Sequence, residues 1–261
     1  MANSEFEHIL KAKEKSLTCT IKDPETDTNF KFEIFNRISL GRAQSSLHKE
    51  RDTINWIRSF EPDCIFYDIG ANVGVFSIFA GVVSNAEVYA FEPLASNYFA
   101  LINNINKNKL SDKITAFCMA LSDNNEFTKL HMPNLNIGVS GSSVGTPMNY
   151  KLEPTKMDFS QGILSFSLDK IINEWGLPVP NYVKIDVDGV EHKIIKGAKS
   201  LLKNKKLKSI LIEINPNRPE HQKLPEILIN NGFNYDKFET DAKRIKDDRY
   251  NKGEANYIFY R

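Results

Sequence analysis

Short apolar runs alternate with amphipathic stretches from Cys64 onward, and this alternation predicts an α/β domain. Most of the runs are nearly continuous in Ile, Val and Leu, which is typical of parallel strands covered by helices on both faces. The last two follow each other without a helix, so we expect an antiparallel hairpin at one edge. The prediction is a doubly wound, seven-stranded, mostly parallel sheet. Its strands are Cys64–Ile69, Glu87–Phe91, Lys113–Met119, Tyr182–Ile185, Ser209–Ile214, Asn234–Glu239 and Ala255–Tyr260.

Helices are predicted between the strands, wherever apolar residues recur at a helical spacing. The segment His131–Gly162 lacks such a pattern and is rich in Gly, Ser, Asn and Pro. A stretch of this length and composition inside a domain is typical of a functional lid or a disordered insertion. The predicted helices are Val73–Val83, Ala95–Asn106, Leu168–Trp175, Glu191–Leu202 and Leu224–Asn231.

The first 60 residues have a different pattern from the rest of the chain. Ser16–Ile21 and Phe30–Phe35 are predicted strands on either side of a polar turn, and a helix is predicted to follow up to Ser59. The motif Glu61-Pro62-Asp63 breaks that helix. We therefore divide the chain into an N-terminal strand and helix extension, residues 1–60, and a main domain, residues 61–261.

The charge and composition of the chain argue against several classes of function. There are 34 Lys and Arg against 33 Asp and Glu, and a net charge of +1 argues against a nucleic-acid or membrane-surface binder driven by net charge. No apolar run approaches the ~20 residues needed to span a bilayer, and we see no secretory signal. Cys19, Cys64 and Cys118 are scattered, which suits reduced thiols, so a cytoplasmic location is expected.

A turn with two glycines follows the first strand of the main domain. Its sequence is Asp68-Ile-Gly-Ala-Asn-Val-Gly74, and the glycines let the backbone turn tightly and approach a ligand at a helix N-terminus. The dinucleotide fingerprint G-x-G-x-x-G would also need glycine where Asn72 and Val75 stand, so it is absent. An acid before the first glycine, as Asp68 is here, suits a ligand with an amine or another cation. S-adenosylmethionine (SAM) carries both an amino group and a sulfonium.

Polar residues also end the next two strands. Glu92 follows Glu87–Phe91, where doubly wound nucleotide binders place the carboxylate that accepts hydrogen bonds from ribose hydroxyls. Ser122 and Asp123 follow the third strand, where a polar side chain can meet an adenine edge. Asp123 can equally form an Asx turn.

A second polar cluster begins at Asp186, which ends an apolar strand at the edge where open α/β sheets bind ligands. Asp188 and Glu191 have the spacing of a helix capping box, and we assign Asp188 mainly to that role. Glu191 also begins the buried face of the following helix, and His192 is next to it. Glu213 lies in an apolar strand, where an unpaired carboxylate is costly. We expect the acids at 186, 191 and 213 to converge, where they can hold a base, orient a hydroxyl or bind a divalent cation.

These motifs together resemble the FkbM-type SAM-dependent methyltransferases, from about Cys64 to Asn215. The family usually has Glu where this chain has Asp188, a conservative departure. The resemblance implies a Rossmann-like class I methyltransferase fold and a SAM site formed by Asp68, Gly70, Asn72, Gly74, Glu92, Ser122 and Asp123. It is carried by Asp68–Gly74, Ala90–Pro93, Asn103 and Asn104, Ala120–Asp123, Ser142 and Ser143, Ser167–Asp169, Lys184–Gly189, Glu191 and Glu213.

The resemblance also implies a reaction, because the family mostly methylates hydroxyl oxygens of sugars, polyketides and related metabolites. The expected acceptor is a sugar or nucleotide-sugar in a polysaccharide or glycan pathway. Methyl transfer is an in-line displacement, so holding the acceptor oxygen behind the methyl carbon supplies much of the catalysis. A carboxylate or histidine near Asp186 is expected to take the hydroxyl proton. The catalytic candidates are Asp186, Glu191, His192 and Glu213.

Several alternatives remain open from the sequence. A divalent metal held by Asp186 and Glu213 would also lower the pKa of the hydroxyl, but the spacing shows no third ligand and we do not favour it. The acceptor can instead be a carboxylate, an amine or RNA, although the nearly neutral charge disfavours RNA. A SAM-binding module without turnover would have no need of the three acids. The absent fingerprint counts against a nicotinamide enzyme.

Overall fold

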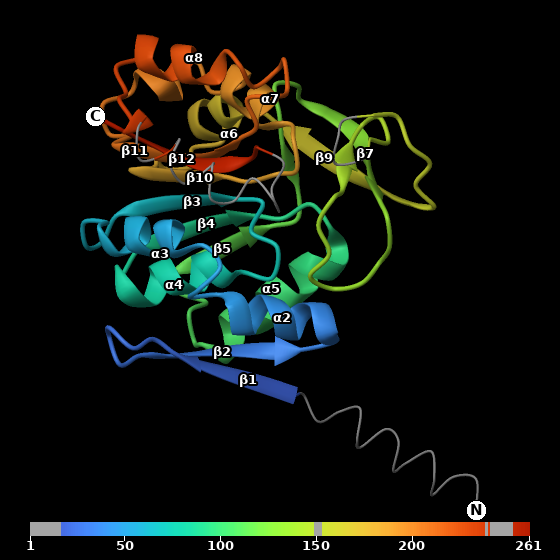
Figure 1. Cartoon of the computed structure of the whole chain (residues 1–261), viewed down its shortest axis with the longest axis vertical. Coiled ribbons are helices and arrows are strands. Elements are labelled where there is room, and N and C mark those ends of the chain that lie inside the picture. Colours follow the sequence, from blue (N-terminus) through green and yellow to red (C-terminus); the bar gives the residue numbers. More distant parts are fainter. Residues whose placement is uncertain (1–16, 149–152, 238–239, 241–252) are drawn as a thin grey trace, which may run out of the picture.

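The computed structural model describes residues 17–148, 153–237, 240 and 253–261. Within this part of the chain, six strands form the main sheet, in the order β12–β11–β10–β3–β4–β5 (Figure 1). All neighbouring pairs are parallel except that β12 pairs antiparallel with β11. The α/β class is therefore confirmed, with a mixed sheet. The strands are β3 (Ile65–Ile69), β4 (Glu87–Phe91), β5 (Ile114–Phe117), β10 (Tyr182–Ile185), β11 (Ser209–Ile214) and β12 (Ala255–Tyr260).

The predicted seventh strand, Asn234–Glu239, is wrong as a strand. Asn234 forms an isolated bridge with Tyr260, beyond β12. The chain then turns helically, since the Thr240 N–H donates to the Asp236 carbonyl over 3.1 Å; residues 238–239 lie outside the described residues. The edge of the sheet is consequently β12, and the predicted hairpin is replaced by the antiparallel pair of β11 and β12.

Helices cover both faces of the sheet, as Figure 1 shows. On one face lie α3 (Arg51–Arg58), α4 (Val75–Val83) and α5 (Ala95–Lys107). The other face is covered by α6 (Leu168–Asn173), α7 (Glu191–Lys196) and α8 (Leu224–Asn230). Each set packs its apolar side chains against the strands in a separate hydrophobic cluster. None of the helices in the described ranges is long and apolar enough to span a bilayer.

The predicted helix Glu191–Leu202 is interrupted. Helix α7 ends at Lys196, and a short 3₁₀ turn, η1 (Leu201–Lys203), follows. Gly197 lies at the break, where a Cβ atom would be 2.3 Å from the carbonyl oxygen of Ser122. The close approach of another loop thus requires glycine there.

The N-terminal segment shares the core of the main domain. Strands β1 (Leu17–Lys22) and β2 (Asn29–Ile34) form an antiparallel hairpin, and two helices follow, α2 (Arg37–Ser45) and α3, where one was predicted. Trp56 of α3 is buried, and its indole N–H donates to the Ser209 hydroxyl over 2.9 Å. Side chains of this segment join one hydrophobic cluster with those of β3 and α4. The segment is therefore packed as part of the same body.

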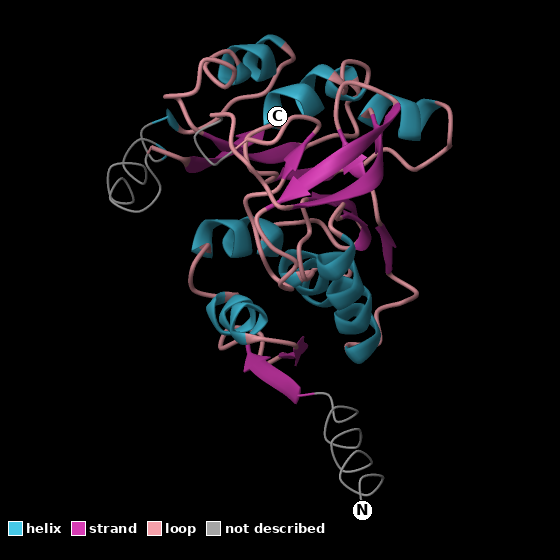
Figure 2. Ribbon diagram, turned by 90° about the vertical axis from the view of Figure 1, so that its right-hand side faces the viewer, coloured by secondary structure: helices cyan, strands magenta, loops and turns pink. Residues whose placement is uncertain are grey.

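A second sheet takes in residues 131–132, 143–144 and 159–162 of the region that we predicted to be a lid or a disordered insertion. Its strands are ordered β6–β9–β7–β8 and lie beside the carboxyl end of the main sheet (Figures 1 and 2). On β7, Leu130 and Met132 are buried while Phe127 is exposed, so the strand is half-exposed. Residues 149–152 of the segment lie outside the described residues. The bounds are β6 (Ala120–Leu121), β7 (Glu126–Met132), β8 (Ser143–Val144) and β9 (Phe159–Phe166).

Candidate active site

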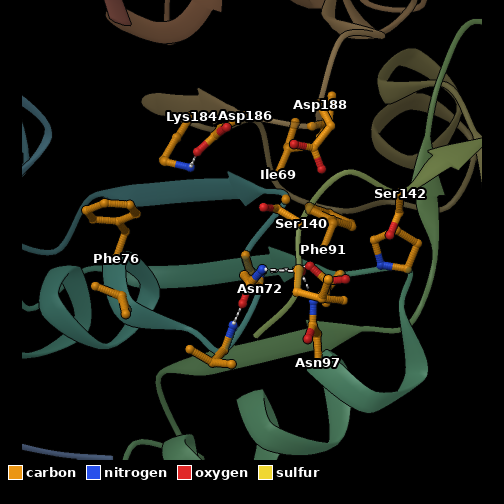
Figure 3. Close-up of a pocket in the computed structure, with 18 of the residues that line it drawn as sticks. Ile69, Asn72, Phe76, Phe91, Asn97, Ser140, Ser142, Lys184, Asp186 and Asp188 are labelled. Carbon is orange, nitrogen blue, oxygen red and sulfur yellow. Dashed lines mark hydrogen bonds and ion pairs between the residues drawn. The ribbon is translucent and has the colours of Figure 1, made fainter. Parts of the chain in front are cut away.

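A cavity opens at the carboxyl ends of β3, β4 and β10, where ligands bind in open α/β sheets. About 1130 Å³ of empty space, part of it open to solvent, lies between its walls. Figure 3 shows side chains that line it. One group of lining residues is apolar and comes from β4, the link between β5 and β6, and the second sheet: Phe91, Met119, Leu121, Leu130 and Val144. The other group is charged: Arg42, Lys49, Glu50, Lys184 and Asp186. Such a lining suits a ligand with a flat apolar part and a charged part.

The glycine turn after β3 forms one wall of this cavity. Gly70 has a φ of +82°, and a Cβ atom there would lie 1.9 Å from the carbonyl oxygen of Asp186. Its N–H donates to the Phe91 carbonyl over 2.9 Å. Only glycine lets the turn pass this close between the ends of β4 and β10.

Glu92 lies at the end of β4 and connects the turn to the cavity. One of its carboxylate oxygens accepts the Asn72 N–H over 2.8 Å, and the other accepts the Leu94 N–H over 2.9 Å. The residue is 5% exposed, and burial raises the pKa of Glu92 to about 7 although both N–H groups oppose the shift. The carboxylate is held rigidly and still lines the cavity, so its remaining lone pairs can accept hydrogen bonds from a ligand.

Four of the predicted cofactor contacts do not line the cavity. Asp68 is fully buried behind its wall, where it accepts a 2.6 Å hydrogen bond from the Ser77 hydroxyl. Gly74 begins α4 in a left-handed conformation and packs against Leu101. The remaining two are Ser122, whose hydroxyl donates to Asp123, and Asp123, which pairs with Lys196 over 2.6 Å. We propose no direct cofactor contact for these four residues.

Lys184 and Asp186 form an ion pair in the cavity wall, 2.9 Å apart. Burial alone would lower the pKa of Lys184, but the charges of Asp186, Asp68 and Glu50 raise it instead. Burial would likewise raise the pKa of Asp186, but Lys184, with help from Arg42 and Lys49, lowers it. Both groups therefore stay charged at neutral pH, and Asp186 is a weaker base than a free carboxylate.

The predicted capping box of Asp188 and Glu191 does not form. Helix α7 has no side-chain cap, and Glu191 instead accepts the N–H groups of Val187 (3.2 Å) and Gly189 (3.1 Å). The other Glu191 oxygen lies 3.1 Å from Nε2 of His221. The Asn215 N–H donates to Nδ1 of the same ring, so Nε2 carries the ring proton, and its hydrogen-bond partner is the Gly189 carbonyl at 3.3 Å. The Glu191 oxygen beside Nε2 is buried and has no hydrogen-bond partner among the described residues. Through the oxygen that accepts the two N–H groups, the Glu191 carboxylate stabilises the turn 186–189.

Asp188 therefore faces the cavity. It has a φ of 60°, and its carboxylate accepts the Gly141 N–H over 2.7 Å. The side chain contacts solvent at the mouth of the cavity, yet neighbouring atoms desolvate it. This desolvation, with the charges of Asp186 and Glu191, raises the pKa of Asp188 to about 6.

A second cavity of about 900 Å³, again partly open, adjoins the first. The two share Ser142, Val144, Asp188 and Val190 in their walls. Its lining combines apolar surface with hydroxyls and charged groups, which include Ser143, Thr146, His192, Lys193 and Glu220. Asp188 thus lies where the two cavities meet.

His192 and Glu213 complete the sequence-predicted set. His192 is half-buried in the wall of the second cavity, and burial together with nearby His221 lowers the pKa of His192. Burial, followed by the charges of Asp186 and Glu191, raises the pKa of Glu213 well above its usual value. The charges of Asp186 and Glu191 thus act on Glu213, but of these three acids only Asp186 lines the first cavity, and none lines the second. In the described part of the chain, no group of three or more His, Cys, Asp and Glu side chains has the arrangement of a metal site.

The raised pKa of Glu213 predicts a pH effect on stability. The folded protein holds a proton on Glu213 at pH values where the unfolded chain, with a pKa of about 4.3, has released it. Stability therefore falls as pH rises above that value. We therefore measure the free energy of unfolding in urea at several pH values. Between about pH 5 and about pH 8 it should fall less for Glu213→Gln than for the wild type. The exposed Glu126→Gln should behave as wild type, and equal slopes in all three proteins would contradict the assignment.

The fold and cavity define an α/β protein with a ligand cavity at the carboxyl edge of its sheet. Residues 68–235 match the family described as the methyltransferase FkbM domain. The chain therefore belongs to the FkbM methyltransferase family, and the resemblance inferred from the motifs is confirmed. This part of the chain is a SAM-dependent methyltransferase domain, as predicted.

Other similarities are weaker. The chain is 25% identical over 169 residues to the hexuronic acid methyltransferase AglP of Haloferax volcanii, spanning 64% of this chain and 63% of that relative. The structure is similar to precorrin-6y C5,15-methyltransferase from Geobacter metallireducens, with a TM-score of 0.46 and 14% identity over 81% of this chain and 86% of the other. It is also similar to TYW2 of M. jannaschii in complex with AdoMet (0.44, 14%, covering 95% and 88%). Neither structural similarity bears on the substrate.

Proposed function

We propose that the protein transfers the methyl group of SAM to a hydroxyl oxygen of a sugar. The observation that carries the proposal is the position of Asp188, a carboxylate with a raised pKa in the wall that two adjoining cavities share. Such a junction is where a methyl donor and a hydroxyl acceptor have to meet. The hydroxyls of Ser142, Ser143 and Thr146 in the second cavity suit a sugar, and the relative AglP is named for a hexuronic acid.

Residues of the first cavity fit SAM. Glu92 can accept hydrogen bonds from the ribose hydroxyls, with the Asn72 and Leu94 N–H groups holding its carboxylate in place. The apolar side chains of Phe91, Met119 and Leu121 suit the adenine ring. When bound, SAM supplies an electrophilic methyl group. The protein's own residues supply the orientation of the acceptor oxygen and a destination for its proton.

Asp188 is the base that we propose for that proton. With a pKa of about 6 it is ionised at neutral pH, yet basic enough to accept a proton as the new bond forms. Asp186, predicted as the base from sequence, has a lowered pKa and is paired with Lys184. Glu191 is a positioning residue, because its contacts with Val187 and Gly189 fix the turn that carries Asp188.

The second cavity also indicates the charge of the acceptor. Lys193 and His192 come from α7, and Lys193 forms no ion pair within the described residues. A cation in this wall favours a sugar that carries an acidic group, such as a uronic acid. Asp188 and Glu220 are acids in the same lining, so the preference concerns only the end of the cavity beside Lys193.

Transfer of labelled methyl groups tests the proposal. The protein is incubated with methyl-labelled SAM and a panel of nucleotide-linked hexoses, nucleotide-linked hexuronic acids, oligosaccharides and transfer RNA. We expect label in the carbohydrate fractions, with the acidic sugars ahead of the neutral ones. Label in RNA alone, or in no acceptor of the panel, would count against a sugar methyltransferase.

A further inference from the structure

Part of the first cavity is built by residues that precede the family domain. Arg42, Ser45 and Ser46 come from the end of α2, and Lys49 and Glu50 from the loop before α3. All five line the cavity, although the family match begins at residue 68. This segment, residues 42–50, has so far been given no function.

Two cations of this segment face the cavity without a carboxylate partner. The Nε–H of Arg42 donates to the Gly138 carbonyl over 3.1 Å, which holds the guanidinium against the loop above the cavity. Within the described residues, neither Arg42 nor Lys49 forms an ion pair. Both lie near enough to Asp186 to lower the pKa of its carboxyl group. The remaining guanidinium N–H groups of Arg42 are therefore available to an anion.

The Ser46 hydroxyl is a second, independent observation that points to a ligand at this segment. The residue is 7% exposed and lines the cavity, and its buried hydroxyl oxygen has no hydrogen-bond partner. Buried hydroxyls are nearly always hydrogen-bonded, and each exception needs an explanation. A ligand oxygen in the cavity would satisfy the Ser46 hydroxyl.

The amino-acid end of SAM has the matching chemistry. It is a zwitterion, with a carboxylate and an ammonium on one carbon atom, so its receptor needs a cation and an anion close together. The cavity holds both, since Asp186 is ionised and lies near the two cations. Glu50, an acid of the same segment, has a pKa raised by burial and by the charge of Asp186.

We propose that the segment 42–50 binds the amino-acid end of SAM. Arg42 and the Ser46 hydroxyl hold the carboxylate, Lys49 adds positive charge, and Asp186 receives the ammonium. The inference rests on the proposed use of this cavity for SAM. It makes the N-terminal segment part of the cofactor site.

Two ligands that differ only at this end test the inference. S-adenosylhomocysteine carries the amino acid, whereas 5′-methylthioadenosine has the adenosine and sulfur without it. In calorimetry we expect Arg42→Gln and Ser46→Ala to weaken S-adenosylhomocysteine binding, roughly tenfold for Arg42, and to leave methylthioadenosine binding unchanged. The control is Arg37→Gln, an exposed arginine at the start of α2, which should change neither.

The outcomes separate the inference from the function on which it rests. If the variants bind both ligands more weakly to the same extent, the segment has a structural role. If the binding of both ligands is unchanged, the segment does not contact the cofactor. Either result overturns the inference. Ser46→Ala leaves the contact of Arg42 with Gly138 intact, so it remains informative if Arg42→Gln disturbs the loop. A wild-type protein that binds neither ligand would contradict the proposed function itself.

Discussion

Asp188→Asn is expected to lower kcat about 10²–10⁴-fold, the usual effect of losing a general base, while the Kd for S-adenosylhomocysteine stays as in the wild type. Asparagine tolerates the left-handed φ of 60° at this position. Its side-chain oxygen can still accept the Gly141 N–H. The substitution thus removes the basic carboxylate and leaves the turn in place.

The pH profile gives a second readout for Asp188. A base has to be deprotonated to act, so the wild-type kcat/KM should rise with pH through about 6, the pKa of Asp188. That rise should be absent from the residual activity of Asp188→Asn. The exposed Asp112→Asn serves as the matched control and should keep both the rate and the profile.

A small effect of Asp188→Asn would contradict the proposed mechanism. An acceptor that attacks as a carboxylate has no proton to lose, so it needs no base. A kcat that falls less than about tenfold, with Kd and Tm intact, would therefore favour methylation of a carboxylate over a hydroxyl. A lower kcat, a higher Kd and a lower Tm in the same variant would show that Asp188 only supports the fold.

Glu92→Ala is expected to weaken S-adenosylhomocysteine binding by about 1–3 kcal/mol, a roughly 5- to 150-fold rise in Kd. The substitution removes the ligand contacts and also leaves the Asn72 and Leu94 N–H groups without their acceptor. Methylthioadenosine contains the same ribose, so its Kd should rise as well. This distinguishes Glu92 from Arg42, whose variant should affect only the ligand with the amino acid.

Glu87→Ala is the control for Glu92, because Glu87 begins the same strand at its exposed far end. Calorimetry and Tm are measured together for both variants. Affinity unchanged in Glu92→Ala, with a folded protein, would reject the assignment of this carboxylate to the ribose.

The main sheet could be predicted from sequence because its strands are buried on both faces. Glu87–Phe91 and Tyr182–Ile185 have the predicted bounds, since each is a short apolar run between polar turns. The strands β7 and β9 were missed because one face of each is exposed, so their polar alternation resembles a loop. The break at Gly197 was missed because its cause is a contact with Ser122, which is distant in the sequence.

The sequence predicts those residues of the candidate site that directly follow a strand. Glu92 and Asp186 both line the cavity for this reason. Asp188 was misinterpreted because its spacing to Glu191 fits a capping box, whereas the backbone at 188 is left-handed and redirects the side chain. The Asp-Gly pair at 188–189, a typical turn signal, was the available hint. His221 and Arg42 reach the site only through tertiary contacts, so no local pattern revealed them.

Identification of the methylated atom tests the central claim most directly. The product is made with SAM carrying a ¹³C-methyl group and a sugar acceptor that accepts label, and its two-dimensional NMR spectrum is recorded. We predict that the new methyl protons correlate with a ring carbon of the sugar, which is the signature of a methyl ether at a hydroxyl. A correlation with a carboxyl carbon, or a methyl group bonded to nitrogen, would contradict the account.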